Sequence, residues 1–419
     1  MEKIQENIGQ YKIFDAFGNV DGSHMSIISQ NRNAIRKIAS LNAYTAYNNP
    51  LLCKYLKNLG SQVTDIPFNY SGLLTGSLDN TNNVLIQNDL LSMTGVKYVI
   101  DSDGAIAKNN GMIYSNESST EPYSSSQFLQ ISHKPGKIGI FESPFSAIIQ
   151  GQEQTPQCYK VVITLTEEQR KNTTYLAADL YGGPNYDRST EEKRFQVTED
   201  QGQYTAYLYA QQTELATETI RLRILASNND TENSIYKVDV FKVTPIEGYR
   251  YWDKTQDGTA IYENINAKSL LYVPQTVETK KNFDDIYLNC DNYSLDKIAY
   301  VDVEHMDLQN SDTQVEVKEQ TRNTVTASCS STADTFLCFS QNYSPDWRVY
   351  VDGEQQTIHM VNGLIMGAQI PAGNHEIRFV YHEDSYLIGF YITFITYAGL
   401  VAAYFVERRR KYASAHKAE

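Results

Sequence analysis

One stretch near the C-terminus constrains this chain more than any other feature. Residues Tyr386 to Val406 (YLIGFYITFITYAGLVAAYFV) form a run of 21 amino acids without a charged side chain. As an α-helix this run is roughly 30 Å long, which matches the hydrocarbon core of a bilayer. Tyr391 and Tyr404 lie toward its ends, where amphipathic rings favour the membrane interface. The pattern predicts a transmembrane helix over residues 386–406 rather than a buried core helix.

Charge on the two sides of this helix predicts its orientation. The chain has 36 Lys and Arg against 50 Asp and Glu, a net charge of −14. The tail of residues 407–419 begins ERRRK and carries +3, so residues 1–385 carry −14 − 3 = −17. Because basic loops stay on the cytoplasmic side, we expect a cytoplasmic tail and an extracytoplasmic bulk.

A bulk domain outside the cell needs an export signal. The first 30 residues contain no basic segment followed by an apolar run, so they do not resemble a secretory signal peptide. Two explanations stay open. The chain is either tail-anchored and faces the cytoplasm, or it is a fragment of a polytopic protein whose upstream helices carry the bulk across the bilayer.

The composition indicates folded, strand-rich domains. Hydrophobic residues make up 41% and charged residues 21% of the 419 residues, which excludes wholesale disorder and allows several domains. So acidic a chain argues against nucleic acid as a partner, since affinity for phosphates comes from Lys and Arg. The 31 Tyr exceed the 15 Phe and 2 Trp, and Tyr favours strands.

The N-terminal quarter differs from the rest. Residues 1–104 are predicted to form a mixed α/β extracytoplasmic domain, with helical spacing at 31–41 and 50–59 and a buried strand at 96–100. A Ser-, Asn- and Gly-rich stretch at 101–130 follows and marks a boundary.

Residues 105–248 are predicted to form a β-sandwich domain. Five runs there alternate apolar and polar residues between turn residues: KVVITL, TYLAADLYG, QYTAYLYA, IRLRILAS and YKVDVFKV. The predicted fold class is therefore mainly β with a small α/β N-terminal part. It has antiparallel β-sandwich domains followed by one C-terminal transmembrane helix.

Residues 249–385 are predicted to form a second β domain. Asp352-Gly353 and Asn362-Gly363 separate alternating runs, and both dipeptides favour type I′ hairpin turns because both turn positions need φ > 0. We expect a small meander in which Trp347 shares one face with Val349 and Val351.

Motifs that bring catalysis are scarce. Asp101-Ser102-Asp103-Gly104 follows a strand, as in some metal-binding glycosyltransferases, but Asp and Gly are equally favoured at a strand-to-loop exit. The seven His show no zinc spacing, and there is no G-x-S-x-G, P-loop or G-x-G-x-x-G. We assign no catalytic residue, no metal and no cofactor.

Aromatic residues suggest a different chemistry. Tyr181 and Tyr186 lie in LYGGPNYD, and Tyr251 and Trp252 lie in GYRYWD, in both cases beside Asn or Asp. Flat rings stack on sugar rings, so these four residues are candidate carbohydrate contacts. Core packing is the alternative for each of them.

Five cysteines (Cys53, Cys158, Cys290, Cys329 and Cys338) contain no C-x-x-C. A turn near residues 333–334 would place Cys329 and Cys338 opposite each other on a hairpin. The sequence leaves open whether they form a disulfide or are two buried free thiols.

Several segments resemble the extracytoplasmic C-terminal region of YfhO-type bacterial membrane proteins. The match is strongest in YSPDWRVYVDGEQQTIHMVNGLIMGAQIPAGNHEIRFVYH (343–382), although Asp346 stands where the family has Gly. MTGVKYVI (93–100), IYENINAKSLLYV (261–273) and, more loosely, SLNAYTAYNN (40–49) resemble other family elements. In the third segment Lys268-Ser269 departs from the family's Leu-Pro-Arg.

The resemblance implies a function in the bacterial cell membrane. YfhO-type proteins are similar to lipid-carrier-dependent (GT-C-like) glycosyltransferases, which move a sugar from a polyprenyl phosphate onto surface polymers such as teichoic acid. Their catalytic acidic residue lies in an early loop that matches no position here. The implied partners are the lipid bilayer, a surface glycopolymer and a polyprenyl-phosphate sugar. A membrane-anchored, non-catalytic carbohydrate-binding or adhesion module is the alternative.

Overall fold

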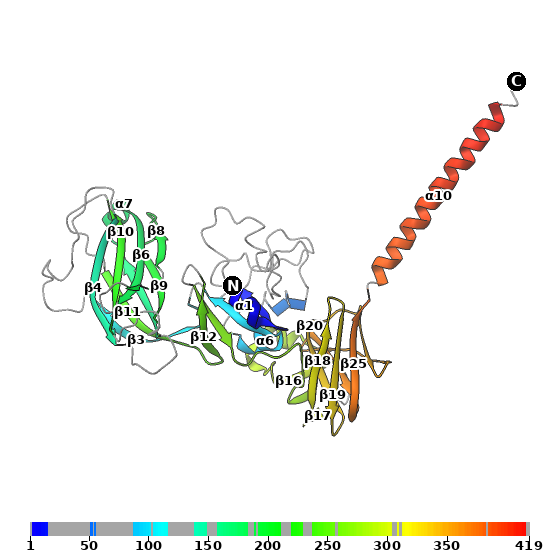
Figure 1. Cartoon of the computed structure of the whole chain (residues 1–419), viewed down its shortest axis with the longest axis horizontal. Coiled ribbons are helices and arrows are strands. Elements are labelled where there is room, and N and C mark those ends of the chain that lie inside the picture. Colours follow the sequence, from blue (N-terminus) through cyan, green and yellow to red (C-terminus); the bar gives the residue numbers. More distant parts are fainter. Residues whose placement is uncertain are drawn as a thin grey trace. The chain divides into compact units, whose positions relative to one another are not determined.

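The computed structural model describes most of the chain, in ranges that leave gaps. They are residues 2–15, 51–52, 54–55, 87–101, 104–115, 138–148, 157–182, 188–189, 192–210, 219–228, 237–255, 259–303, 308–309, 312–382 and 384–415. The chain forms two compact units: unit 1 is Met1–Leu270 with Phe283–Asp296, and unit 2 is Leu271–Asn282 with Lys297–Glu419. Strands dominate both units, which confirms the predicted fold class (Figure 1). The boundaries predicted at residues 104, 248 and 385 stay predictions.

A four-stranded sheet of unit 1 contains the N-terminal strands. Its order is β1 (Lys12–Asp15), β2 (Val96–Asp101), β13 (Ala260–Asn264) and β12 (Tyr249–Lys254). Strands β1 and β2 are parallel, and the other neighbours are antiparallel. Helices α1 (Glu2–Ile8) and α6 (Asn88–Met93) accompany it, and Ile4 and Ile8 of α1 pack on Ile13, Tyr98 and Ile261.

Two of these strands come from a distant part of the sequence. Strand β13 pairs with β2 over Tyr262↔Val99 and Glu263↔Tyr98. Local alternation predicts a strand, but the partner strand depends on which apolar faces meet in the folded chain.

Two further sheets of unit 1 form the predicted sandwich. The first has the order β4 (Ile138–Ile148), β10 (Thr219–Asn228), β6 (Thr173–Gly182) and β7 (Arg188–Ser189), with β8 (Lys193–Gln196) also on β6. The second has the order β3 (Ala107–Ser115), β11 (Lys237–Pro245), β5 (Gln157–Thr164) and β9 (Gln203–Ala210). Residues such as Leu180 and Ile224 from the first sheet and Val161 and Val240 from the second share one buried core.

Short helices of unit 1 are fixed by local contacts. Helix α7 (Glu167–Asn172) starts with a capping box, in which Thr166 and Gln169 bond each other's backbone N–H groups. Helix α9 (Asp284–Leu288) and the 3-10 turn η1 (Cys290–Asn292) follow in the second segment of this unit. The predicted helix at 31–41 lies outside the described residues. Of the predicted helix at 50–59, the structure describes only residues 51–52 and 54–55, and these are helical.

Unit 2 is built from two sheets. The seven-stranded sheet has the order β14 (Leu271–Tyr272), β20 (Thr335–Asn342), β24 (Ile365–Ile370), β23 (His359–Val361), β16 (Ile298–Val301), β15 (Thr276–Thr279) and β17 (Leu308–Gln309). The five-stranded sheet has the order β18 (Gln314–Gln320), β19 (Thr324–Ser331), β25 (Gly373–Tyr381), β21 (Trp347–Val351) and β22 (Glu354–Gln356). Phe339 of the first sheet packs on Trp347 and Phe379 of the second, at 5.1 and 4.7 Å between ring centroids.

The predicted hairpin turns of unit 2 are confirmed. Asp352 and Asn362 each have φ of 51°, and the glycines that follow them have φ of 86° and 65°, as a type I′ turn requires. Trp347 is buried with Val349 and Val351 on one face, also as predicted.

The strands nevertheless do not form one meander. The chain leaves the five-stranded sheet after β22 and enters the seven-stranded sheet at β23, where Val361 pairs with Val301. The buried Asn362 side chain fixes this crossing, because it accepts a bond from the Tyr300 N–H (2.8 Å) and donates to the Ile298 carbonyl (3.2 Å).

The expected hairpin around residues 333–334 is wrong for a similar reason. Strand β19 pairs with β18 and β25, whereas β20 pairs with β14 and β24, so the two lie in different sheets. Cys329 and Cys338 are both buried free thiols, the second of the two alternatives.

The apolar run forms part of a long helix, α10 (Asp384–Ala415). Residues Gly389–Arg409 are long and apolar enough to cross a membrane, and none of that window is buried in the protein. Large side chains such as Ile395 and Tyr397 are 68% and 69% exposed. This excludes the alternative of a buried core helix.

Candidate functional site

Two segments that carry the family resemblance lie side by side in unit 1. Residues 93–100 lead into β2, and residues 261–273 begin in β13, its antiparallel neighbour. Across this pair, Lys97 Nζ lies 3.9 Å from Glu263 Oε1. The Glu263 carboxylate also binds Arg250 of β12, whose Nε is 2.6 Å from Oε2. One half-buried carboxylate therefore holds two cations at this surface.

Aromatic rings lie against Lys97, one of the two cations. Lys97 Nζ lies 4.9 Å above the centre of the Tyr11 ring and 5.4 Å above that of Tyr98. The Trp252 ring packs on Tyr98 with centroids 4.5 Å apart. Burial and the Glu263 charge raise the pKa of Tyr98, so its hydroxyl stays protonated at neutral pH. We call Tyr11, Lys97, Tyr98, Trp252 and Glu263 the aromatic patch.

The structure separates the four predicted carbohydrate contacts. Trp252 is half-buried in the aromatic patch. Tyr251, on the same strand, is buried and stacks on Tyr209 at 4.6 Å. Tyr181 is buried on β6 in the sandwich, with the Arg223 guanidinium 5.8 Å from its ring centre. Tyr186 lies outside the described residues, and sugar contact stays a prediction for all four.

Sequence reasoning missed a buried amide network beneath the patch. Asn264 is 2% exposed, and its side-chain nitrogen donates to Ser92 Oγ and to the Val96 carbonyl, both at 3.0 Å. Its side-chain oxygen accepts from Asn88 Nδ2 at 3.0 Å. A signal was present in Tyr262-Glu263-Asn264, where a polar residue ends a buried strand. The network ties α6 to β13.

The Asp101 motif has a structural role. Both carboxylate oxygens accept backbone N–H groups of the loop that follows, from Gly104 and Ala105 at 2.9 and 3.2 Å and from Ile106 at 2.9 Å. Such bonds occupy the oxygens that a metal would need. Over the ranges given above, no group of three or more His, Cys, Asp and Glu is arranged to hold a metal ion.

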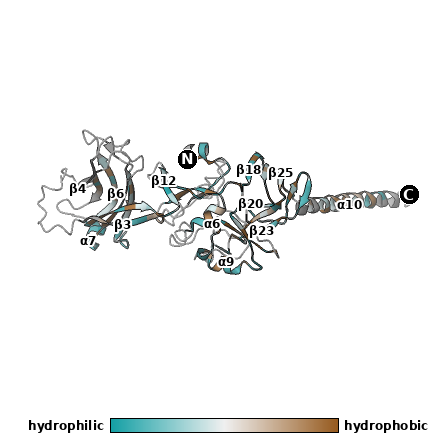
Figure 2. Ribbon diagram, turned by 90° about the horizontal axis from the view of Figure 1, so that it is seen from below, coloured by the Kyte–Doolittle hydropathy of each residue, from teal (hydrophilic) through white to brown (hydrophobic). Residues whose placement is uncertain are grey.

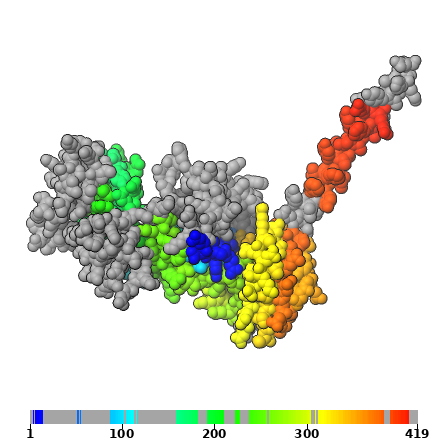
Figure 3. Space-filling view, in the orientation of Figure 1, coloured from blue at the N-terminus to red at the C-terminus, as the bar shows by residue number. Residues whose placement is uncertain are grey.

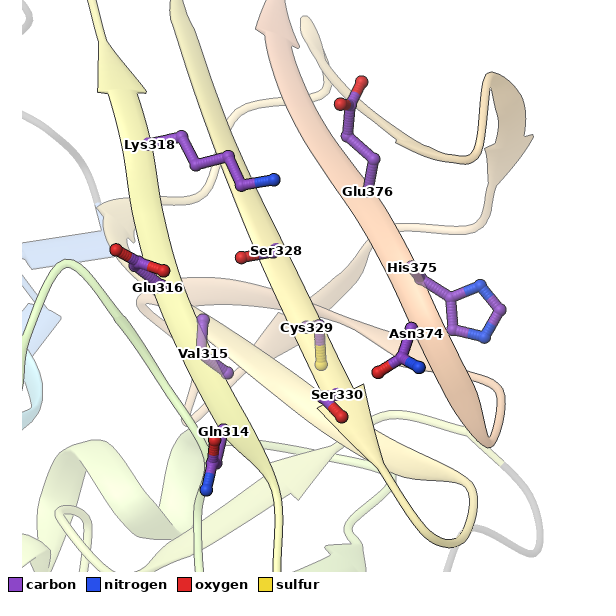
Figure 4. A pocket seen from close by; sticks show the side chains of 10 residues that line it. All are labelled: Gln314, Val315, Glu316, Lys318, Ser328, Cys329, Ser330, Asn374, His375 and Glu376. Carbon is purple, nitrogen blue, oxygen red and sulfur yellow. The ribbon is translucent and has the colours of Figure 1, made fainter.

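A polar groove of about 490 Å³ lies over β18, β19 and β25 of unit 2 (Figure 4). Most of its polar side chains come from alternate positions of the three strands: Gln314, Glu316 and Lys318, then Ser328 and Ser330, then Asn374 and Glu376. The intervening residues Val315, Cys329 and His375 also line it. In the space-filling view the yellow surface of β18 and β19 adjoins the orange surface of β25 (Figure 3). Hydropathy colouring shows β18 and β25 with teal, hydrophilic stretches (Figure 2). We call this site the β18–β25 groove.

A histidine–aspartate pair fixes one end of the groove. His375 Nδ1 lies 2.6 Å from Asp352 Oδ2, and its Nε2 lies 3.2 Å from the Ala372 carbonyl. Asp352 Oδ1 accepts the Glu376 N–H at 2.8 Å. The hydrogen bond to Asp352 raises the pKa of His375, and the same bond lowers the pKa of Asp352. The pair joins the turn after β21 to the start of β25.

Cysteine chemistry is disfavoured at this site. Cys329 lies directly opposite His375 on the neighbouring strand and contributes to the groove wall. It is only 2% exposed, and burial raises the pKa of its thiol. A nucleophilic cysteine needs a lowered pKa, so Cys329 is a structural residue.

Comparison with protein families decides the classification. The family model of the bacterial membrane protein YfhO matches residues 41–393, which is most of the chain. The chain belongs to the YfhO family. This confirms the resemblance carried by the quoted segments. It also makes the chain a membrane protein, with α10 as its candidate membrane helix.

Similarity to other proteins is weak. No curated protein matches the chain. Two solved structures of the arabinofuranosyltransferase AftD from Mycobacteria match at 8% and 9% identity, over 67% and 58% of this chain and 22% and 21% of theirs. This YfhO family chain thus spans about a fifth of the solved protein's length. The TM-scores of 0.16 and 0.17 are too low to support an inference.

Proposed function

We propose that this chain is the extracytoplasmic portion and a membrane helix of a lipid-carrier-dependent, GT-C-like glycosyltransferase. Its acceptor would be a cell-surface polymer such as teichoic acid, and its donor a polyprenyl-phosphate sugar. YfhO family membership is the observation that carries this proposal. No residue of this chain is given a catalytic role. Its two β-rich units would position or recognise the acceptor polymer near the membrane.

Charge supports the proposed orientation. The −17 of residues 1–385 and the +3 of residues 407–419 flank the apolar run, and by the positive-inside rule this difference supports a cytoplasmic tail. Protease added to intact cells should therefore degrade both β-rich units and spare an epitope attached after Glu419. Protection of both units would contradict this topology.

The activity is tested in cells. Cells that lack the protein should carry surface polymer with less of one sugar, measured by composition analysis and NMR of the isolated polymer, and the intact gene should restore it. Unchanged sugar content would refute the transferase proposal. If the protein still bound the polymer in that case, the result would support the alternative, a non-catalytic carbohydrate-binding or adhesion module.

Trp252 is the most accessible of the three described carbohydrate candidates, so the sugar-contact proposal is best tested there. Trp252→Phe keeps a flat ring beside Tyr98, whereas Trp252→Ala removes it. We expect the Ala variant to lose polymer binding by about fivefold and the Phe variant to lose much less, since stacking of aromatic rings contributes about 1 kcal/mol. Equal binding by both variants would remove Trp252 from the proposal.

A further inference from the structure

The depth of the β18–β25 groove follows from the sizes of its side chains. Across the three strands, Gln314 lies opposite Ser330, which lies opposite Asn374. In the next row, Glu316 lies opposite Ser328, which lies opposite Glu376. Residues directly opposite each other share one face of the sheet. Each row therefore has a short serine between two longer polar side chains, and a trough results along β19 (Figure 4).

The fold does not use these polar groups. Among the described residues, no hydrogen bond or ion pair engages the side chains of Gln314, Glu316, Lys318, Ser328, Ser330, Asn374 or Glu376. The opposite face of the same strands is buried, as Ala327 and Ile377 show at 0% exposure. The backbone under the groove is therefore held rigidly while its polar side chains stay available. A ligand would find these hydrogen-bonding groups unoccupied along a fixed backbone.

The donors and acceptors of the groove suit hydroxyl groups. Amides and serine hydroxyls both donate and accept, carboxylates accept, and the Lys318 ammonium donates. A sugar hydroxyl also does both, so neighbouring hydroxyls can pair with neighbouring side chains of the groove. The volume of about 490 Å³ lies within the range of small-ligand sites.

Charge disfavours phosphate groups inside the groove. Glu316 and Glu376 outweigh Lys318 within the groove, and residues 1–385 carry −17. Both fields repel a polyanion. We infer that the β18–β25 groove binds a neutral, hydroxyl-rich saccharide. The inference deepens the proposed function and rests on it in one respect: the saccharide would be a sugar unit of the acceptor polymer and not its phosphate-bearing backbone.

Titration calorimetry on the full-length protein in detergent micelles tests the inference. The probes are neutral hexose and N-acetylhexosamine oligomers, with a glycerol-phosphate oligomer as the anionic comparison. Ser330→Phe fills the trough, and Glu376→Gln removes one charged acceptor without changing shape. Thr326→Phe is the matched control, because Thr326 lies two residues from Ser328 on the same face of β19 but does not line the groove.

We expect at least one neutral oligomer to bind the native protein, the glycerol-phosphate oligomer to bind more weakly, and Thr326→Phe to bind as the native protein does. Ser330→Phe and Glu376→Gln should each weaken binding at least tenfold, since hydrogen bonds to charged groups contribute on that scale. Glu376→Gln keeps the test valid if Ser330→Phe fails to fold.

Three results would overturn the inference. They are no binding of any neutral oligomer, unchanged binding by both groove variants, and tighter binding of the glycerol-phosphate oligomer than of any sugar. Failure of the transferase proposal is seen separately, as unchanged polymer composition in cells that lack the protein. That result does not alter the outcome of the binding measurement.

Discussion

Asn362 offers the sharpest test of how unit 2 is held together. Its side chain is fully buried, and it completes the backbone bonding of β16 by accepting from the Tyr300 N–H and donating to the Ile298 carbonyl. Its φ of 51° is a left-handed conformation that Asn and Gly tolerate better than other residues. Asn362→Gly therefore removes the side-chain bonds alone, whereas Asn362→Ala removes them and adds backbone strain.

The magnitude follows from the groups left behind. Asn362→Gly removes the side-chain partner of a buried N–H and of a part-buried C=O, each costing about 1–3 kcal/mol, so we expect a loss of about 3 kcal/mol in the free energy of unfolding. Asn362→Ala should lose about 1 kcal/mol more, because an L residue is strained in this conformation. Asp312 is the matched control, since its φ is 48° but it is exposed. Asp312→Gly should change stability by less than about 0.5 kcal/mol.

The two tryptophans make the assay specific. Trp347 lies in unit 2 and Trp252 in unit 1, so a Trp252→Phe background leaves fluorescence that reports on unit 2 alone. With a urea dependence of about 1.5 kcal/mol per molar, Asn362→Gly should lower the unfolding midpoint of the full chain in detergent by about 2 M. Equal midpoints for Asn362→Gly and Asp312→Gly would refute the role given to the buried amide.

Three further predictions use the same fluorescence or its unit 1 counterpart, Trp252 in a Trp347→Phe background. Gly367→Ala should destabilise unit 2 by several kcal/mol, because the added Cβ would lie 2.4 Å from Phe336 Cε1 and 2.8 Å from the Leu337 carbonyl oxygen. Gly353→Ala is the control: its Cβ would point into open space at φ of 86°, so unit 2 should lose only about 1 kcal/mol of stability. The His375–Asp352 pair should stabilise unit 2 fully between about pH 4 and 6.5. Because the His375 pKa is raised, the stability that His375 contributes is lost as the pH rises through that pKa, and because the Asp352 pKa is lowered, the contribution of Asp352 is lost only as the pH falls through that lower pKa. The urea midpoint of the native chain should therefore fall between about pH 6 and 9 relative to that of His375→Gln, and parallel pH profiles would contradict this. Arg223→Met should destabilise unit 1 by about 3–5 kcal/mol, because it leaves the fully buried Asp179 carboxylate unpaired. The double variant Arg223→Met with Asp179→Leu should recover most of this stability. A double variant as unstable as Arg223→Met alone would show that the unpaired carboxylate is not the cause.

Local features of the fold were predictable from the sequence. The turns at Asp352-Gly353 and Asn362-Gly363 depend on backbone conformations that few residues adopt, so the dipeptides alone predict them. The apolar run that became part of α10 needs only length and the absence of charge. In each case the physical cause lies within a few residues of the feature.

Sheet membership was not predictable, because it depends on distant segments. Strand β13 joins β2 across more than 150 residues, and β22 and β23 lie in different sheets although only two residues separate them. The groove shows the same limit. Its polar residues on β18, β19 and β25 each look like a solvated strand face in the sequence, and only the pairing places them in facing rows.

The residues that carry the family resemblance and those proposed to bind ligand differ in kind. Gly353 and Gly363 permit their turns, Trp347 fills the core between the two sheets, and Asn264 bonds within a buried network. Each has a structural task that would be needed whatever the protein bound. The groove residues of β18 and β19 lie outside every quoted family segment, and their side chains support nothing in the fold. The resemblance therefore identifies the framework, whereas specificity for a saccharide would depend on positions such as Glu316 and Ser330. Exchanging the groove residues between family members should then change the preferred sugar without changing the stability of unit 2.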